Sequence, residues 1–322
     1  MKRHLLYSED KLRGLLYGTW IGDAAGASFE GYGPDLIPSL DSHYFISHPP
    51  VTYTDDTQMT ISVLEEMVEN GEIIQESLKE RFLKRFSPWR HYSGGMLEVI
   101  ERWRSGEHIE SAARSLYGGM GSFGDGAAMR VAPISAFFSI KSIEDFTEQV
   151  KLCSSLTHTH PYGISGAVLQ GYAVLLALNE VSPEDWFTHF YQLEIESAYK
   201  IKLGDVARAL KHQASAHESV RMVGNGADAL DAVSAAIYSF LRNPSSFEDS
   251  LTFAISMGGD TDTIAAMTGA IAGAFWGYKR IPSWLLGSLE NGKNGRVLVE
   301  KLISKAVENR ENIRRGEDSN LR

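Results

Sequence analysis

Apolar side chains recur at helical spacing along most of the chain. In residues 55–71, Met59, Val63 and Met67 share one helix face, and Gly71 stands where a glycine commonly ends a helix. The same spacing predicts further helices over residues 143–156, 162–180, 225–243 and 297–310. We find no convincing series of alternating polar and apolar residues that would predict strands. Because strands hold about a fifth of an ordinary globular chain, their absence predicts an all-α fold.

A row of glycines marks the helical pattern over residues 18–31. Gly18, Gly22 and Gly26 recur every four residues, so one helix face is nearly bare backbone. That face permits close helix packing or close approach of a ligand, and packing is the interpretation that we favour for the glycines themselves. Asp23 inside this helix is expected to bond backbone groups. Glu30 at its exit is a candidate acid or base if it faces other functional groups, and otherwise a solvated glutamate.

The composition is that of one globular protein. The 322 residues are 43% hydrophobic and 22% charged, which is ordinary for a water-soluble chain. No tandem repeat and no break in composition divides the sequence. We expect a single all-helical domain over residues 1–308 and a charged tail over residues 309–322 that is frayed from the fold.

Charge and cysteine content narrow the possible partners. The net charge of −10 disfavours binding to a phosphate backbone, so no nucleic-acid partner is expected. The uncharged run over residues 264–278 is shorter than the roughly 20 residues that a membrane span needs, and residues 1–14 lack the apolar region of a signal peptide. Cys153 is the single cysteine, which excludes a disulfide within the chain and a cysteine-based zinc site. We expect a cytoplasmic monomer that does not bind membranes.

Two acidic clusters, residues 54–57 and 260–263, each stand directly before a helical pattern. For either cluster alone, capping of the helix end is the simpler explanation, because Asp and Thr are favoured at that position. One helix start needs one cap, however, and adjacent carboxylates repel each other unless a cation compensates. Together the clusters offer hard oxygen ligands of the kind that suit Mg²⁺, Ca²⁺ or Mn²⁺. The candidate ligands are Thr54, Asp55, Asp56, Asp260, Asp262 and Thr263.

Two further segments carry weaker signals. The glycine-rich stretch over residues 116–130 leads into a helix, and such a turn presents free N–H groups that can hold a phosphate. A flexible surface loop explains it equally well. His158, in the segment LTHTHPYG, is either a ligand contact or an ordinary loop histidine. No Gly-x-Ser-x-Gly motif is present, so nothing supports a serine hydrolase mechanism.

The ordered set of these segments resembles the ADP-ribosylglycohydrolase family, which includes dinitrogenase reductase-activating glycohydrolases and ADP-ribosylhydrolases. The resemblance covers residues 11 to 280 and is closest to the branch that acts on serine-linked ADP-ribose. The matching stretches are GDAAGASFE, YTDDTQM, GSFGDGAAMRVAPIS, LTHTHPYG, GNGADALDAVSAAIY and GGDTDTIAAMTGAIAGA.

The resemblance implies a compact orthogonal bundle of helices around two Mg²⁺ ions, for which Mn²⁺ is a possible substitute. The six candidate ligands above match the metal shell, and Glu30 matches a mobile glutamate near the metals. Glu30 and Asp260 would handle protons in the reaction. The ligand cleft would be formed by Gly121, Ser122, Phe123, Gly124, Asp125, Gly126, His158, Tyr92 and Gly95.

One position departs from the family pattern. Asp125 stands where the family usually has Asn or a small residue, and a carboxylate beside a diphosphate is electrostatically unfavourable. Its side chain either points away or bonds a ribose hydroxyl.

The activity that the resemblance implies is hydrolysis at C1″ of ADP-ribose attached to serine or arginine side chains, to poly(ADP-ribose) or to an acetyl group, with ADP-ribose released. Two alternatives stay open. One is a non-catalytic module that binds ADP-ribose, and the other is a magnesium-dependent hydrolase of another small nucleotide conjugate.

Overall fold

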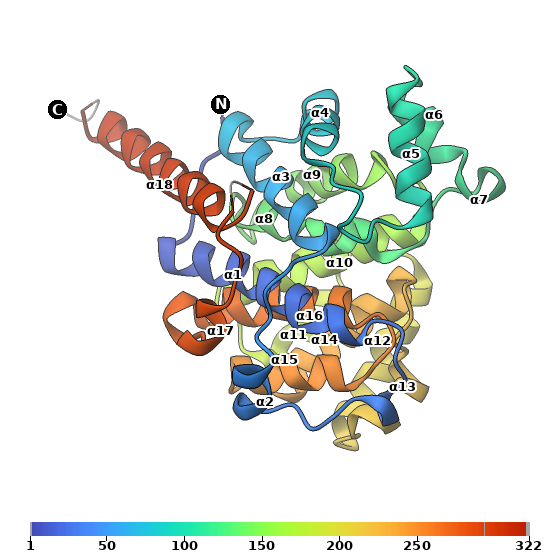
Figure 1. The fold of residues 1–322 in the computed structure, drawn as a ribbon. Coiled ribbons are helices and arrows are strands. Elements are labelled where there is room, and N and C mark those ends of the chain that lie inside the picture. The colour runs from blue at the N-terminus through green and yellow to red at the C-terminus, as the bar shows by residue number, and fades with distance from the viewer. Residues whose placement is uncertain (1, 293, 320–322) are drawn as a thin grey trace.

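The computed structural model describes residues 2–292 and 294–319, and every regular element in this part of the chain is helical (Figure 1). The all-α fold that the sequence predicts is therefore confirmed. The α-helices are α1 (Glu9–Gly26), α2 (Ser42–Ser47), α3 (Asp55–Asn70), α4 (Gln75–Arg85), α5 (Gly94–Arg104), α6 (Ile109–Arg114), α7 (Leu116–Gly119), α8 (Ala132–Ser135), α9 (Ile143–Ser155), α10 (Pro161–Leu178), α11 (Trp186–Phe190), α12 (Ser197–Lys211), α13 (Ala216–Val223), α14 (Ala229–Arg242), α15 (Phe247–Ser256), α16 (Thr261–Trp276), α17 (Ser283–Gly287) and α18 (Arg296–Ser319). Short 3₁₀ segments cover Ala27–Phe29, Pro34–Leu36, Asp125–Arg130, Pro183–Asp185 and Tyr278–Arg280.

The helices that periodicity predicts are present with small shifts at their ends. Helix α3 stops where predicted, because Gly71 adopts the left-handed conformation (φ 73°) and its N–H bonds the carbonyl of Met67. The pattern over residues 225–243 becomes helix α14 only from Ala229. Residues 225–228 are instead a connecting segment, which makes backbone contacts to the site described below.

The close contact between α1 and α16 organises the centre of the molecule (Figure 1). Their backbones touch: a Cβ added at Gly18 would lie 2.1 Å from the carbonyl oxygen of Gly269, and one added at Gly22 would lie 2.0 Å from that of Ala265. The packing role that we favour for these glycines is confirmed. The contact sets the C-terminal end of α1 beside the N-terminal end of α16, where Gly26 meets the backbone of Thr261.

Helix α10 forms another part of the core. It is the one helix in the described residues that is long and apolar enough to cross a membrane, with a mean hydropathy of 1.3. Since 83% of that window is buried inside the fold, and core helices of water-soluble proteins have the same character, this is weak evidence for a span. The expectation that membranes are not bound stays a prediction.

Helix α18 crosses the boundary that we expect at residue 308. It begins at Arg296 and continues to Ser319, so no helix end marks a tail from residue 309. The division into one domain and a charged tail stays a prediction, and residues 320–322 lie outside the described part of the chain.

Candidate metal centre and ligand cleft

The N-terminal end of α3 carries the first acidic cluster. Thr54 is the capping residue, and its hydroxyl accepts a hydrogen bond from the N–H of Asp56 at 3.4 Å. The same hydroxyl donates to Oδ2 of Asp56 at 3.0 Å. Because Thr54 caps the helix, the carboxylates of Asp55 and Asp56 are not needed for that purpose.

The second cluster lies at the N-terminal end of α16 and meets the first. Asp260 occupies the capping position, yet its side chain makes no capping hydrogen bond. The N–H of Thr263 donates to Oδ1 of Asp262 at 3.0 Å, and the hydroxyl of Thr263 donates to Oδ2 of Asp56 at 3.5 Å. Residues about 200 positions apart in the sequence are thus in direct contact, as the metal hypothesis requires.

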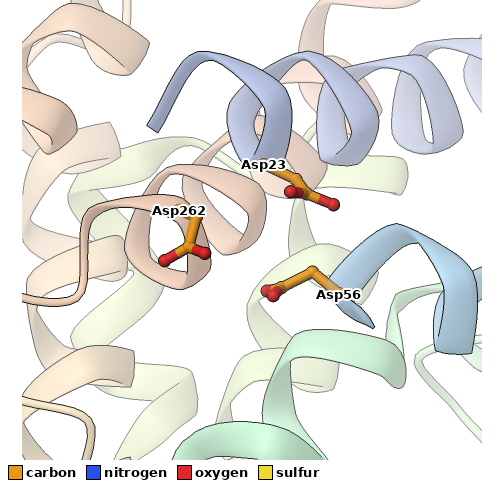
Figure 2. Close-up of side chains that lie close together, drawn as sticks. All are labelled: Asp23, Asp56 and Asp262. Atoms are coloured by element: carbon orange, nitrogen blue, oxygen red, sulfur yellow. The ribbon is translucent and has the colours of Figure 1, made fainter. Parts of the chain in front are cut away.

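Asp23 of α1 completes the centre, and sequence reasoning gave it no part in a metal site. Its carboxylate accepts hydrogen bonds from the N–H groups of Thr54 and Thr57 and, at 2.6 Å, from the hydroxyl of Thr57. One oxygen from each of Asp23, Asp56 and Asp262 lies within 4.8 Å of the others, and Figure 2 shows the three side chains around one space between their helices. The signal for Asp23 was its place among the glycines of α1, which bring it close to α16.

Ionisation of the carboxyl groups in this centre is unfavourable when no cation is present, because they are buried and close to one another. Burial raises the pKa of Asp23 to about 6, and burial together with the charge of Asp23 raises the pKa of Asp55 to about 8. The pKa values of Asp56 and Asp262 are also raised well above the usual range, chiefly by burial. Within the described residues, no lysine or arginine forms an ion pair with these groups.

A hard divalent cation fits this donor set. Oδ1 of Asp56 is buried with no hydrogen-bond partner, as is Oδ2 of Asp125 nearby. Such oxygens carry a desolvation penalty that a cation would remove. The other donors are carboxylate and hydroxyl oxygens, which Mg²⁺ and Mn²⁺ prefer.

The raised pKa values predict how stability depends on pH without metal. A carboxyl group whose pKa is higher in the folded chain than its unfolded value of about 3.9 binds its proton more tightly when folded. Its protonation therefore favours folding, and that contribution is lost as the pH rises. With EDTA present, Tm should fall from pH 5 to pH 8, the range over which Asp23 (about 6) and Asp55 (about 8) lose their protons.

Thermal melts in EDTA and in MgCl₂ at both pH values measure this effect. Mg²⁺ should remove most of the fall, because its charge compensates the ionised carboxylates. In EDTA, the fall in Tm between pH 5 and pH 8 should be smaller for the Asp125→Asn variant than for the unchanged protein, because one buried carboxyl group is gone. A Tm in EDTA that is the same at pH 5 and pH 8 would contradict the picture of an uncompensated acidic centre.

The acidic centre opens into a cleft that gathers most of the candidate residues. The glycine-rich segment forms part of its wall, with Ser122, Gly124, Asp125 and Gly126 all facing it. Residues 121–130 are largely buried rather than a flexible surface loop. The cleft is also lined by Glu30, Asp55, Asp56, Gly95, His158, Asp260, Asp262 and Thr263.

Residues 225–228 tie this wall to the acidic centre. The N–H of Asp125 donates to the carbonyl of Ala227 at 3.1 Å, and the N–H of Asp260 donates to the carbonyl of Asn225 at 2.9 Å. The Asn225 side chain donates to the carbonyl of Met257, which precedes the Gly258–Gly259 turn. The wall and the centre are therefore held by one short strip of backbone.

Asp125 turns toward the acidic centre. It is 7% exposed, and burial together with the charges of Asp260 and Asp262 raises its pKa well above the usual range. Of the two alternatives for this side chain, the one in which it points away does not match the structure, because Asp125 lines the cleft. The other alternative, a bond to a ribose hydroxyl, stays a prediction.

Of the candidate residues at the cleft, Glu30 is half exposed and His158 is buried. The Glu30 side chain is 49% exposed at the cleft rim, with Oε2 at 3.6 Å from Nδ1 of His91. Backbone hydrogen bonds between Gly31 and Gly259 and between Gly259 and Tyr32 hold the segment that follows α1 beside the acidic centre. His158 is buried at 9% exposure, and burial lowers its pKa to about 3, so the ring is neutral.

Four candidate residues do not line the cleft. Thr54 caps α3, and the hydroxyl of Tyr92 donates to Oε1 of Gln58 at 2.9 Å. Gly121 shapes the turn, with φ 75° and no room for a side chain against Thr159. Phe123 is 39% exposed, and its ring contacts Tyr117, a residue of the cleft.

Comparison with known proteins gives the same family as the motifs. Residues 6–313 match the model of the family described as ADP-ribosylglycohydrolase. The chain is 36% identical to ADP-ribosylhydrolase ARH3 of Xenopus tropicalis, covering 91% of this chain and 94% of the relative. It is 27% identical to ADP-ribosylarginine hydrolase Tri1 of Serratia proteamaculans (strain 568), covering 94% of this chain and 81% of the relative.

A solved structure supports the fold. The chain superposes on a structure titled "ADP-ribosylglycohydrolase-related protein complex" with a TM-score of 0.67, at 22% identity, covering 92% of this chain and 96% of that one. The family match and the relative at 36% identity cover nearly the whole sequence. The chain therefore belongs to the ADP-ribosylglycohydrolase family, whose members are hydrolases that act on glycosyl bonds.

Proposed function

We propose that this protein is a magnesium-dependent ADP-ribosylhydrolase. It cleaves the bond between C1″ of the distal ribose of ADP-ribose and the group to which that ribose is attached, and it releases ADP-ribose. The observation that carries the proposal is the meeting of carboxylates from α1, α3 and α16 at a cleft whose wall is the glycine-rich segment. A sugar bearing vicinal hydroxyls and a diphosphate suits such a combination of donors.

Two Mg²⁺ ions, with Mn²⁺ as a possible substitute, are the proposed cofactors. The residues that would hold them are Thr54, Asp55, Asp56, Asp260, Asp262, Thr263 and Glu30. Asp23 would hold the start of α3 in place through its bonds to Thr54 and Thr57 and adds its charge to the centre. When bound, the cations compensate the carboxylates and polarise the oxygens that bind them.

The side chains at the cleft have the chemistry for hydrolysis of a glycosidic bond. The C1″–O bond breaks with development of positive charge on the ribose ring, which carboxylates beside the ring stabilise. Asp260 accepts a proton from the attacking water, and Glu30 gives a proton to the leaving oxygen. Glu30 suits this exchange because it lies at the rim, where it can reach both substrate and solvent.

We propose serine-linked ADP-ribose as the first substrate class, and arginine-linked ADP-ribose, poly(ADP-ribose) and O-acetyl-ADP-ribose as further candidates. The relative named for arginine linkages is 27% identical to this chain, whereas ADP-ribosylhydrolase ARH3 of Xenopus tropicalis is 36% identical. This difference favours a linkage other than arginine.

Parallel turnover assays test the proposal. Peptides that carry ADP-ribose on serine or on arginine, poly(ADP-ribose) and O-acetyl-ADP-ribose are each incubated with the protein in MgCl₂ or in EDTA, and released ADP-ribose is quantified. We expect release that depends on Mg²⁺, faster from the serine peptide. Binding of ADP-ribose with no release from any of the four substrate classes would instead show a binding module, and release of a different product would indicate another nucleotide conjugate.

Changing Glu30 to Gln should affect catalysis more than binding. The amide keeps the size of the side chain but cannot exchange a proton, so turnover should fall about 10²- to 10⁴-fold. The affinity for ADP-ribose should change by less than about threefold, which is below the usual effect of one lost hydrogen bond. Steady-state kinetics and calorimetry measure the two quantities.

The control for this change is Glu184→Gln, which makes the same substitution on the exposed 3₁₀ segment Pro183–Asp185. It should leave both quantities unaltered. If Glu30→Gln turns over as fast as the unchanged protein, Glu30 has no part in proton transfer.

A further inference from the structure

A buried arginine connects the cleft wall to the end of α9. Arg130 is fully buried, and its Nη1 donates to the carbonyl of Gly126 at 2.8 Å. Its Nη2 donates to the carbonyl of Cys153 at 2.9 Å and to the hydroxyl of Thr157 at 2.8 Å. The guanidinium group therefore holds the glycine-rich segment and the residue before His158 in one arrangement.

The arginine determines where the Thr157 proton goes. A guanidinium group can only donate, so the Thr157 oxygen accepts from Arg130. The other hydrogen-bond partner of that hydroxyl is Nδ1 of His158, at 2.7 Å. If Nδ1 carried a proton, the Thr157 hydroxyl, in a side chain that is 2% exposed, would be left without an acceptor. Because a buried donor without an acceptor is unfavourable, the hydroxyl donates and Nδ1 accepts.

The other ring nitrogen of His158 faces the cleft wall. An added Cβ at Gly126 would lie 3.3 Å from Nε2, and one at Gly124 would lie 3.7 Å from it. His158 and both glycines line the cleft. With Nδ1 accepting, a neutral ring carries its proton on Nε2, which is directed to the space in front of these glycines.

We propose that Arg130 and Thr157 are positioning residues that fix His158 as the Nε2–H tautomer, so that the cleft receives one hydrogen-bond donor for an oxygen atom of the ligand. The proposal rests on the proposed function for the nature of that ligand. An Nε2–H nitrogen has no free lone pair, so His158 does not bind a cation. It binds an acceptor such as a diphosphate or ribose oxygen of ADP-ribose.

The ring stays neutral at physiological pH for reasons that the structure supplies. Burial and, to a lesser extent, the nearby charge of Arg130 lower the pKa of His158 to about 3. Neutrality alone leaves either ring nitrogen free to carry the proton. The hydrogen bonds from Arg130 to Thr157 and from Thr157 to Nδ1 of His158 place the proton on Nε2.

The tautomer is measured by ¹H–¹⁵N correlation spectra of the histidine rings in the ligand-free protein, in which protonated and unprotonated nitrogens have separate shifts. The chain has 10 histidines, and the His158→Gln variant identifies the signal of interest. We expect an unprotonated Nδ1 and a protonated Nε2. A protonated Nδ1 would overturn the proposal, and it would do so whether or not the protein hydrolyses ADP-ribose.

Two substitutions at residue 157 test the link to binding. Thr157→Val removes the hydroxyl at nearly constant size, so both tautomers should appear and the Kd for ADP-ribose should rise about tenfold. Thr157→Ser keeps the hydroxyl and should restore the spectrum and bring the Kd to within about twofold of the unchanged protein. Thr252→Val is the matched control, because that hydroxyl bonds only carbonyls of its own helix, α15.

The outcomes separate this proposal from the proposed function. An unchanged tautomer and an unchanged Kd in Thr157→Val would overturn the positioning role. If the unchanged protein neither binds nor hydrolyses ADP-ribose while Nε2 is protonated, the proposed function fails and the tautomer assignment stands.

Discussion

Replacement of Asp262 by Ala should lower turnover by about a thousandfold or more, because loss of a buried ligand removes charge stabilisation worth several kcal/mol. Asp262 joins Asp23 and Asp56 in the carboxylate trio. The variant should also lose most of the rise in Tm that Mg²⁺ gives the unchanged protein. In EDTA it should melt at a higher temperature than the unchanged protein, since one of several mutually repelling carboxylates is gone. Turnover assays and thermal melts with and without MgCl₂ measure these three effects.

Asp249→Ala is the control for this change. Asp249 also stands in the first turn of a helix, α15, but it is exposed. Its replacement should alter neither turnover nor the response to Mg²⁺. Full activity of Asp262→Ala, or an undiminished response to Mg²⁺, would refute the assignment of the metal centre.

Replacement of Gly22 by Ala should destabilise the whole fold. The new methyl group would lie 2.0 Å from the carbonyl oxygen of Ala265, so α1 and α16 must move apart. Overpacking of this kind lowers the free energy of unfolding by about 3 kcal/mol or more and Tm by roughly 10 °C. Because Asp23 follows directly, we also expect weaker binding of Mg²⁺, and melting curves with calorimetric titration measure both.

Gly204→Ala is the control for this change, because it adds the same methyl group at a site where no loss of stability is expected. Gly204 lies inside α12, and an added Cβ meets nothing within 4 Å. Alanine is favoured over glycine in a helix by about 1 kcal/mol, so this variant should be equally or more stable. If Gly22→Ala were as stable as Gly204→Ala, the close contact between α1 and α16 would not be essential.

Local patterns were sufficient to predict most of the fold. The spacing of Met59, Val63 and Met67 and the stop at Gly71 fix α3 without knowledge of any neighbour. The first residue of α14 could not be predicted in this way. Residues 225–228 continue the helical composition but form a non-helical link, held by bonds to the cleft wall and to Asp260, which no local pattern reveals.

The acidic clusters could be found because their members adjoin one another in the sequence, and the structure brings them together. Asp23 could not be found in this way, because its partners Thr54 and Thr57 are more than 30 residues away. Arg130 and Thr157 were missed because their contact joins two segments 27 residues apart and neither residue belongs to a recognisable motif. For Tyr92 and Phe123, which do not line the cleft, a role in the ligand cleft stays a prediction, since adjacency to cleft residues in the sequence does not fix the direction of a side chain.

The strip of backbone at residues 225–228 has a consequence for engineering. It holds Asp125 and Asp260 through main-chain hydrogen bonds, and the Asn225 side chain adds a bond to the carbonyl of Met257. Directed evolution toward new conjugates should therefore leave this strip unchanged and randomise the outer lip of the cleft, such as His91, Ser93 and Tyr117. Libraries confined to that lip would alter selectivity while the proposed cation-dependent step is retained.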